Sequence, residues 1–151
     1  MIVYGGLTLL LMLFIFMMSS QDGEHSGNLS KSFLGSLLGR FLEEILPKLS
    51  GRGAEHDIRK YAHMFEFFCL GISSYCFLLE WRMRDRARLF FSGTAAWGFC
   101  FLYACSDEWH QSFVPGRAGL FSDVLIDSAG FSAAILIMTW IMLRRNKKMM
   151  Q

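Results

Sequence analysis

Four long apolar stretches constrain this chain more than any other feature of its sequence. Each is close to the roughly 20 residues with which an α-helix crosses a bilayer, and they cover residues 2–18, 61–79, 89–105 and 124–143. In lipid every backbone polar group needs an internal partner, so such stretches must be helices. Charged residues make up only 19% of the chain, against about 25% in an ordinary soluble domain. The sequence predicts an all-α membrane protein with four transmembrane helices, in one domain over residues 1–151.

Lys and Arg residues near the span ends predict how the chain is oriented. The segments 82–88 and 144–148 together hold eight of the 15 Lys and Arg residues. Because such clusters stay on the cytoplasmic side, we expect both termini inside and segments 19–60 and 106–123 outside. The first span lacks a basic flank and a cleavage-site pattern, which favours a retained anchor over a signal peptide. The net charge of +2 is too small to indicate a nucleic-acid partner.

A further helix is expected between the first two spans. Apolar residues recur at helical spacing between positions 29 and 46, and the charged residues of this segment fall away from them. Pro47 ends the pattern. We predict an amphipathic helix over residues 29–46 that lies in the outer membrane interface. A helix packed on a soluble partner domain is the alternative.

Ionisable residues near the predicted outer ends of spans two to four indicate a functional site, because charge within a membrane span is costly. In the second span Lys60, His63 and Glu66 follow i, i+3, i+6 spacing, which places them close to one helix face. If the third helix continues beyond its apolar stretch, Asp107 and Gln111 share a face with His110, and Glu108 lies beside them. These helices are therefore expected to bring several polar groups together.

The connection to the fourth span adds a cation and two more carboxylates. Pro115 and Gly116 suit the two central positions of a type II turn, which would send Arg117 back toward the helix ends. Asp123 and Asp127 are four residues apart, so they share a face at the start of the fourth helix. Small residues around Gly130 would allow another helix to approach closely.

Three chemistries fit these residues. The first is acid–base catalysis by His63 with a carboxylate partner, while Lys60 or Arg117 holds an anion. The second is a divalent metal ion, with ligands drawn from His63, Asp107, Glu108, Asp123 and Asp127. These ligand types suit zinc or a harder ion, and the identity of the metal stays unknown because the order and spacing match no metal motif. The third is recognition of an anionic head group without turnover.

A purely structural role is the plainest alternative. Asp123 would then cap the fourth helix, where the helix dipole favours an anion. Asp127, Glu66 and Arg117 would form a buried ion-pair network that fixes how the helices pack.

Several motifs follow one another along nearly the whole chain: Ser19-Ser20-Gln21, Lys60-x-x-His63-x-x-Glu66, Asp107-Glu108-x-x-Gln111 with Pro115-Gly116-Arg117, and Asp123-x-x-x-Asp127-x-x-Gly130. Together they resemble the VanZ-like family of small bacterial membrane proteins. The compound pattern of the last motifs is specific, whereas the serine–glutamine piece alone is weak. The chain departs from the family at Phe67-Phe68 and at Ser132-Ala133, and neither departure touches a charged motif residue.

The resemblance implies a cell-envelope protein of the bacterial plasma membrane, with a family link to teicoplanin-type glycopeptide resistance. It implies no agreed reaction. We expect an outward-facing polar site that binds a membrane lipid or a lipid-linked cell-wall component, with the helix over residues 29–46 as a lid or guide. The expected ligand contacts are Ser20, Gln21, Lys60, Gln111, Arg117, Asp123 and Asp127.

Two other functions stay open beside lipid binding. One is a membrane enzyme that acts on such a lipid, with His63, Glu66, Asp107 and Glu108 as its catalytic residues. The other is a structural subunit whose charges only lock the helices together.

Overall fold

A computed structural model describes residues 2–21, 54–80 and 86–149 as four helices with short connecting segments. The helices are α1 (Ile2–Ser19), α4 (Ala54–Glu80), α5 (Arg86–Gln111) and α6 (Phe121–Met149). Each is long and apolar enough to cross a membrane, and no strand occurs in the described ranges. The prediction of an all-α protein with four spans is confirmed. The amphipathic helix predicted over residues 29–46 lies outside the described residues.

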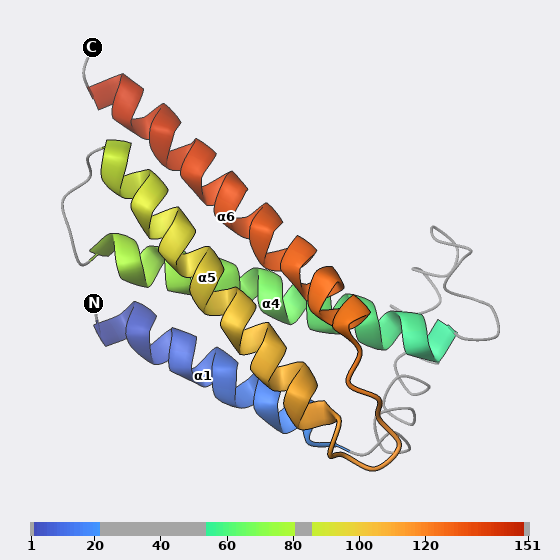
Figure 1. Ribbon diagram of the computed structural model, residues 1–151. Helices are drawn as coiled ribbons and strands as arrows, with labels where there is room; N and C mark the ends of the chain where they lie inside the picture. The colour runs from blue at the N-terminus through green and yellow to red at the C-terminus, as the bar shows by residue number, and fades with distance from the viewer. Residues whose placement is uncertain (1, 22–53, 81–85, 150–151) are drawn as a thin grey trace, which may run out of the picture.

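The four helices run alternately up and down, so their ends gather in two groups (Figure 1). One group contains the starts of α1 and α5 and the ends of α4 and α6. The other contains the ends of α1 and α5 and the starts of α4 and α6. This second group is called the polar end below, because the predicted site residues belong to it. The alternation agrees with the order of spans predicted from the sequence.

Three of the helices extend beyond the apolar stretches from which they were predicted. The segment apolar enough to span begins at Arg59 in α4, and in α5 it continues to Gln111 instead of stopping at Cys105. In α6 it begins at Phe121. These extensions contain the polar residues. A hydropathy pattern excludes such residues from a span, but a transmembrane helix accommodates them when they have partners on neighbouring helices.

The core lies between α4, α5 and α6, where α4 and α6 approach each other closely. Phe67 and Leu70 of α4 and Phe131 of α6 are fully buried. A Cβ atom placed on Gly130 would lie 2.3 Å from the backbone oxygen of Met64, so only glycine fits there. The close helix approach expected around Gly130 is confirmed. Large apolar side chains such as Leu102 and Leu136 point outward, as expected where lipid surrounds a helix bundle.

The connection from α5 to α6 contains the predicted turn. Gly116 has a φ of 74°, and the Arg117 amide donates to the Val114 carbonyl at 3.1 Å. A positive φ at the third position with proline at the second defines a type II turn, so this prediction is confirmed. The turn directs Arg117 back toward the ends of α1 and α5.

Candidate functional site

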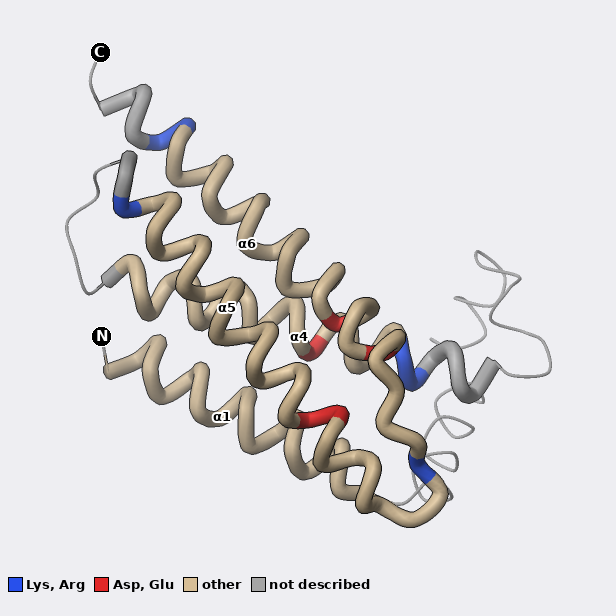
Figure 2. The backbone as a smooth tube through the Cα atoms, in the orientation of Figure 1, with Lys and Arg blue, Asp and Glu red and all other residues tan. Residues whose placement is uncertain are grey.

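The carboxylates of the described helices gather toward the polar end. Figure 2 shows acidic positions on α4, α5 and α6 toward that end, whereas basic positions occur at both ends of the bundle. Asp107, Glu108 and Asp127 are buried. Buried carboxylates are costly unless they are paired or hydrogen-bonded, so their partners decide what this cluster can do.

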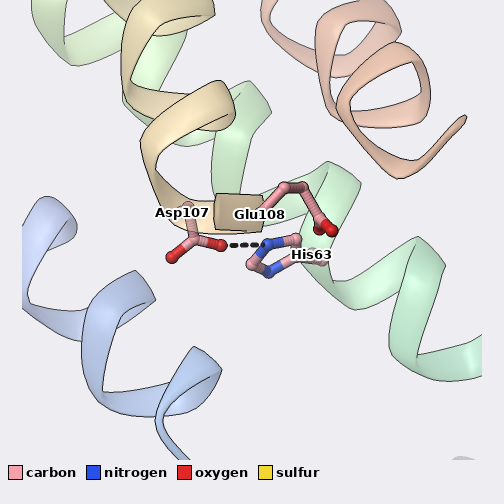
Figure 3. A group of neighbouring side chains, drawn as sticks. All are labelled: His63, Asp107 and Glu108. Carbon is pink, nitrogen blue, oxygen red and sulfur yellow. Dashed lines mark hydrogen bonds and ion pairs between the residues drawn. The ribbon is translucent and has the colours of Figure 1, made fainter. Parts of the chain in front are cut away.

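His63 of α4 lies at the centre of the cluster. Its Nδ1 is 3.1 Å from Glu66 Oε2, one turn along the same helix, and its Nε2 is 3.0 Å from Asp107 Oδ2 of α5. Figure 3 shows the Asp107 carboxylate and the imidazole ring pointing toward one another. Asp127 Oδ2 of α6 lies 3.7 Å from the same Nε2. One imidazole therefore faces carboxylates from three helices.

Gln111 connects the same groups from the last turn of α5. Its Nε2 donates to Asp107 Oδ2 at 2.8 Å and to Glu108 Oε1 at 3.2 Å. It also lies 3.4 Å from Ser19 Oγ and 3.5 Å from His63 Nε2. The amide nitrogen is thus surrounded by acceptors from three helices.

Ser19 brings the end of α1 into this network. It is fully buried, and its hydroxyl donates to Asp107 Oδ2 at 2.8 Å. Ser20, the residue expected to contact a ligand, is exposed, and its hydroxyl donates back to the Phe16 carbonyl. One helical step turns the two side chains about 100° apart, so only one of them can face α5.

Arg117 connects the end of α1 to the end of α5 through hydrogen bonds. Its Nε donates to the Gln21 carbonyl and its Nη2 to the Met18 carbonyl, both at 2.9 Å. Its Nη1 donates to Gln111 Oε1 at 3.1 Å. Burial, and next the charge of Arg59, lower the pKa of Arg117 from its ordinary value, yet a guanidinium stays protonated in proteins.

The ion-pair network considered for Asp127, Glu66 and Arg117 does not form. Within the described ranges, Glu66 and Asp127 lie against His63, and no ion pair joins Arg117 to a carboxylate. The physical reason is that the last carbonyls of α1 have no partner within the helix, and the Arg117 guanidinium satisfies them. Arg117 is therefore less free to bind an anion than the sequence suggested.

Lys60 and Asp123 form an ion pair between α4 and α6, at 2.5 Å. Their side chains are 23% and 19% exposed, whereas that of Asp127 is 2% exposed. The pair therefore lies at the rim of the cluster and Asp127 at its bottom. Asp123 belongs to the first turn of α6, where the helix dipole stabilises a carboxylate. The same carboxylate pairs with Lys60.

A cavity of about 280 Å³ opens between these groups at the polar end. Its wall combines cations, carboxylates and apolar side chains from all four helices. It includes Arg59, Lys60, Arg117, His63, Glu66, Glu108, Gln111, Asp123, Asp127, Met18, Leu120 and Ile126. A cavity of this size accommodates a small polar group such as a phosphate or part of a head group.

Most of the predicted site residues are brought together in this region, and three residues differ from expectation. Ser20 lies outside the cavity wall, and Gln21 takes part through its backbone carbonyl, which accepts from Arg117. His110, expected on the face of Asp107, packs its ring against Phe16 at a centroid distance of 4.5 Å. Ser19 was named within the motif but not among the expected ligand contacts, because the sequence does not show which of two adjacent serines faces inward.

The cluster offers both proton transfer and metal binding. His63 lies between carboxylates at hydrogen-bond distance, which is the arrangement of a general acid or base. His63, Asp107 and Glu108 also offer one ligand atom each, all within 4.8 Å of one another. The rim adds the Lys60 ammonium, which can hold an anion.

A comparison with protein-family models matched residues 5–143 to the family described as VanZ/LLP1. The match includes every residue named above for the cluster and the cavity. No curated protein and no solved structure matched the chain.

Proposed function

Because the chain belongs to the VanZ/LLP1 family, we propose that this multi-pass membrane protein acts in the bacterial cell envelope and binds the polar head group of a membrane lipid or lipid-linked envelope component. The cavity at the polar end is the binding site. The family's link to teicoplanin-type resistance makes lipid-linked cell-wall components the first ligands to test.

The composition of the cavity wall is the single observation that carries this proposal. Its polar part holds the Lys60 ammonium at the rim, and its apolar part includes Leu120 and Ile126. A lipid head group at a membrane interface needs both kinds of contact. Charge-assisted hydrogen bonds to a phosphate are stronger than neutral ones, so Lys60 is the residue from which we expect most of the affinity.

Acid–base catalysis on the same lipid is the second candidate function. The observation that favours it is the position of His63 between Glu66 and Asp107, at 3.1 Å and 3.0 Å. Glu66 would orient the ring, and Nε2 would exchange a proton with the substrate. His63 lines the cavity, so a bound head group would come within its reach.

Native mass spectrometry of detergent-purified protein tests the binding proposal. The informative pair is Lys60→Gln and Asp123→Asn, because each removes one half of the same ion pair. We expect Lys60→Gln to lose an anionic lipid that wild type retains. Asp123→Asn should retain that lipid at least as well, since it frees the Lys60 ammonium. Arg88→Gln, which removes a cation from the other end of the bundle, is the control for net charge.

Loss of the lipid from both the Lys60→Gln and the Asp123→Asn variant would show that the ion pair only holds α4 and α6 together. Equal retention in all variants would place the lipid elsewhere. Catalysis has its own signature in the same measurement: wild type would hold a chemically altered lipid, and Glu66→Gln would hold the unaltered one.

A further inference from the structure

We propose that His63, Asp107 and Glu108 form a binding site for a divalent transition-metal ion of the zinc class, with Asp127 as a fourth ligand. The inference does not depend on lipid binding, because it concerns the protein's own side chains. It rests on four observations: the geometry of the ligand atoms, the hydrogen bond behind the imidazole, an unpartnered buried carboxylate oxygen, and the position of the Gln111 amide.

The distances between ligand atoms suit a four-coordinate ion. Zinc lies about 2.0–2.2 Å from imidazole nitrogen and carboxylate oxygen in a tetrahedral site, so neighbouring ligand atoms are about 3.3 Å apart. His63 Nε2 is 3.0 Å from Asp107 Oδ2 and 3.7 Å from Asp127 Oδ2. These two separations bracket the expected value. Glu108 completes a group with His63 and Asp107 whose ligand atoms all lie within 4.8 Å of one another, and Asp127 approaches this group from the side of His63.

Glu66 orients the imidazole as a metal ligand requires. A ligating histidine usually donates its other ring nitrogen to a carboxylate, which fixes the ring and raises its basicity. Glu66 Oε2 lies 3.1 Å from His63 Nδ1. With Nδ1–H directed at Glu66, the lone pair of a neutral ring is on Nε2, where it faces the oxygens of Asp107 and Asp127. A second ring proton or a metal ion supplies the positive charge between these atoms.

Asp127 supplies an independent sign of a missing ligand. Its side chain is 2% exposed, and its Oδ2 has no hydrogen-bond partner among the described residues. A buried carboxylate oxygen without a hydrogen bond carries a desolvation cost. This oxygen is the one that lies 3.7 Å from His63 Nε2, so it faces the centre of the proposed site.

The Gln111 amide nitrogen occupies the position that we propose for the metal ion. It lies 2.8 Å from Asp107 Oδ2, 3.2 Å from Glu108 Oε1 and 3.5 Å from His63 Nε2. A donor surrounded by these three acceptors does in part what a metal ion would do. Metal binding requires the amide to turn away, so Gln111 competes with the ion.

The donor set favours Zn²⁺ over Mg²⁺ or Ca²⁺, because imidazole suits zinc and the harder ions prefer oxygen ligands alone. His63, Glu108 and Asp127 also line the cavity, so an open coordination position would face it.

The test is metal titration of the chelator-treated, detergent-purified full chain. Stoichiometry is measured by elemental analysis and stabilisation by the thermal shift of tryptophan fluorescence. We expect about one Zn²⁺ per chain and a rise in Tm that Mg²⁺ does not reproduce. Asp107→Asn should weaken Zn²⁺ binding at least tenfold. Asp123→Asn, the same change at the rim, should leave Zn²⁺ binding unchanged.

Gln111→Glu keeps the proposal testable if Asp107→Asn fails to accumulate. It replaces the competing donor with a further ligand, so it should be less stable than wild type without metal and should gain more Tm from Zn²⁺. Wild type that binds no Zn²⁺ overturns the proposal, even if Gln111→Glu binds it, because Gln111 would then exclude the ion. Equal losses in Asp107→Asn and Asp123→Asn also overturn it, since they indicate unspecific attraction to acidic groups.

Discussion

At the residue scale, Asp107 shows how each polar group of the cluster is held from another part of the fold. Its Oδ2 accepts hydrogen bonds from Ser19 of α1 and from Gln111 one turn along α5, and it faces His63 of α4. No single helix supplies these partners. These bonds to Oδ2 hold the carboxylate in one position, which both acid–base chemistry and metal binding require, while Oδ1 is buried without a hydrogen-bond partner among the described residues.

The two adjacent serines at the end of α1 provide a matched test of this arrangement. Ser19→Ala removes a buried donor to Asp107, and leaving a buried acceptor with one partner fewer costs about 1–3 kcal/mol. Ser20→Ala removes only an exposed bond to the Phe16 carbonyl. We therefore expect Ser19→Ala to lower Tm in detergent by several degrees and Ser20→Ala to leave it nearly unchanged. Equal Tm values for the two variants would mean that the Ser19 bond contributes nothing.

At the element scale, the close approach of α4 and α6 sets the geometry of the site. His63 and Met64 are consecutive in α4, and the Met64 carbonyl lies against Gly130 of α6. About two turns further along α4, a Cβ atom on Gly71 would lie 3.0 Å from the Cα of Phe131. Because Asp127 is three residues before Gly130, its distance to His63 depends on this contact.

Gly130→Ala should therefore disturb the site as well as the packing. The added methyl group meets backbone, which cannot move without separating the two helices, and overpacking of this kind typically costs about 1–3 kcal/mol. Gly98→Ala is the control, since its Cβ atom would meet nothing within 4 Å and alanine favours helix. We expect a lower Tm and reduced accumulation in the membrane for Gly130→Ala only. A Gly130→Ala protein as stable as Gly98→Ala would show that the helices separate at little cost.

At the scale of the whole molecule, the two ends of the bundle differ in chemistry. The polar end contains the buried carboxylates and the cavity, whose wall also includes Arg59, Lys60 and Arg117. Arg88 near the start of α5 and Arg144 and Arg145 near the end of α6 belong to the other end, where Figure 2 shows basic positions. Because the clusters of Lys and Arg at 82–88 and 144–148 belong to this other end, the positive-inside rule predicts that it is cytoplasmic. The polar end would then face outward, where a lipid-linked envelope component would reach the cavity.

Reporter fusions test this orientation. A fusion after Gln151 and a truncated fusion after Arg84 should both be cytoplasmic, because each follows an even number of spans. A truncated fusion after Ala118 follows three spans and should be active only with a reporter that works outside. The opposite set of readings would move the cavity to the cytoplasmic face, and the proposed ligand would then have to be sought among lipids of the inner leaflet.

The sequence determined the class of the protein and most residues of its candidate site. Four apolar stretches required four helices, because nothing else satisfies the backbone in lipid. Spacing within single helices placed Lys60 near His63 and Glu66, and it paired Asp107 with Gln111. The Pro115-Gly116 pair specified the turn before Arg117. All these results depend on local geometry, which a single sequence contains.

Only the tertiary structure decided which groups meet between helices. It decided that Ser19, and not Ser20, donates to Asp107. It also decided that Arg117 donates to the Met18 and Gln21 carbonyls. It also directed His110 toward Phe16 and Asp127 toward His63. These outcomes depend on how far each helix is rotated about its axis and how closely it packs on its neighbours. Rotation is set by the summed contacts of all helices at once, so no local pattern in the sequence specifies it.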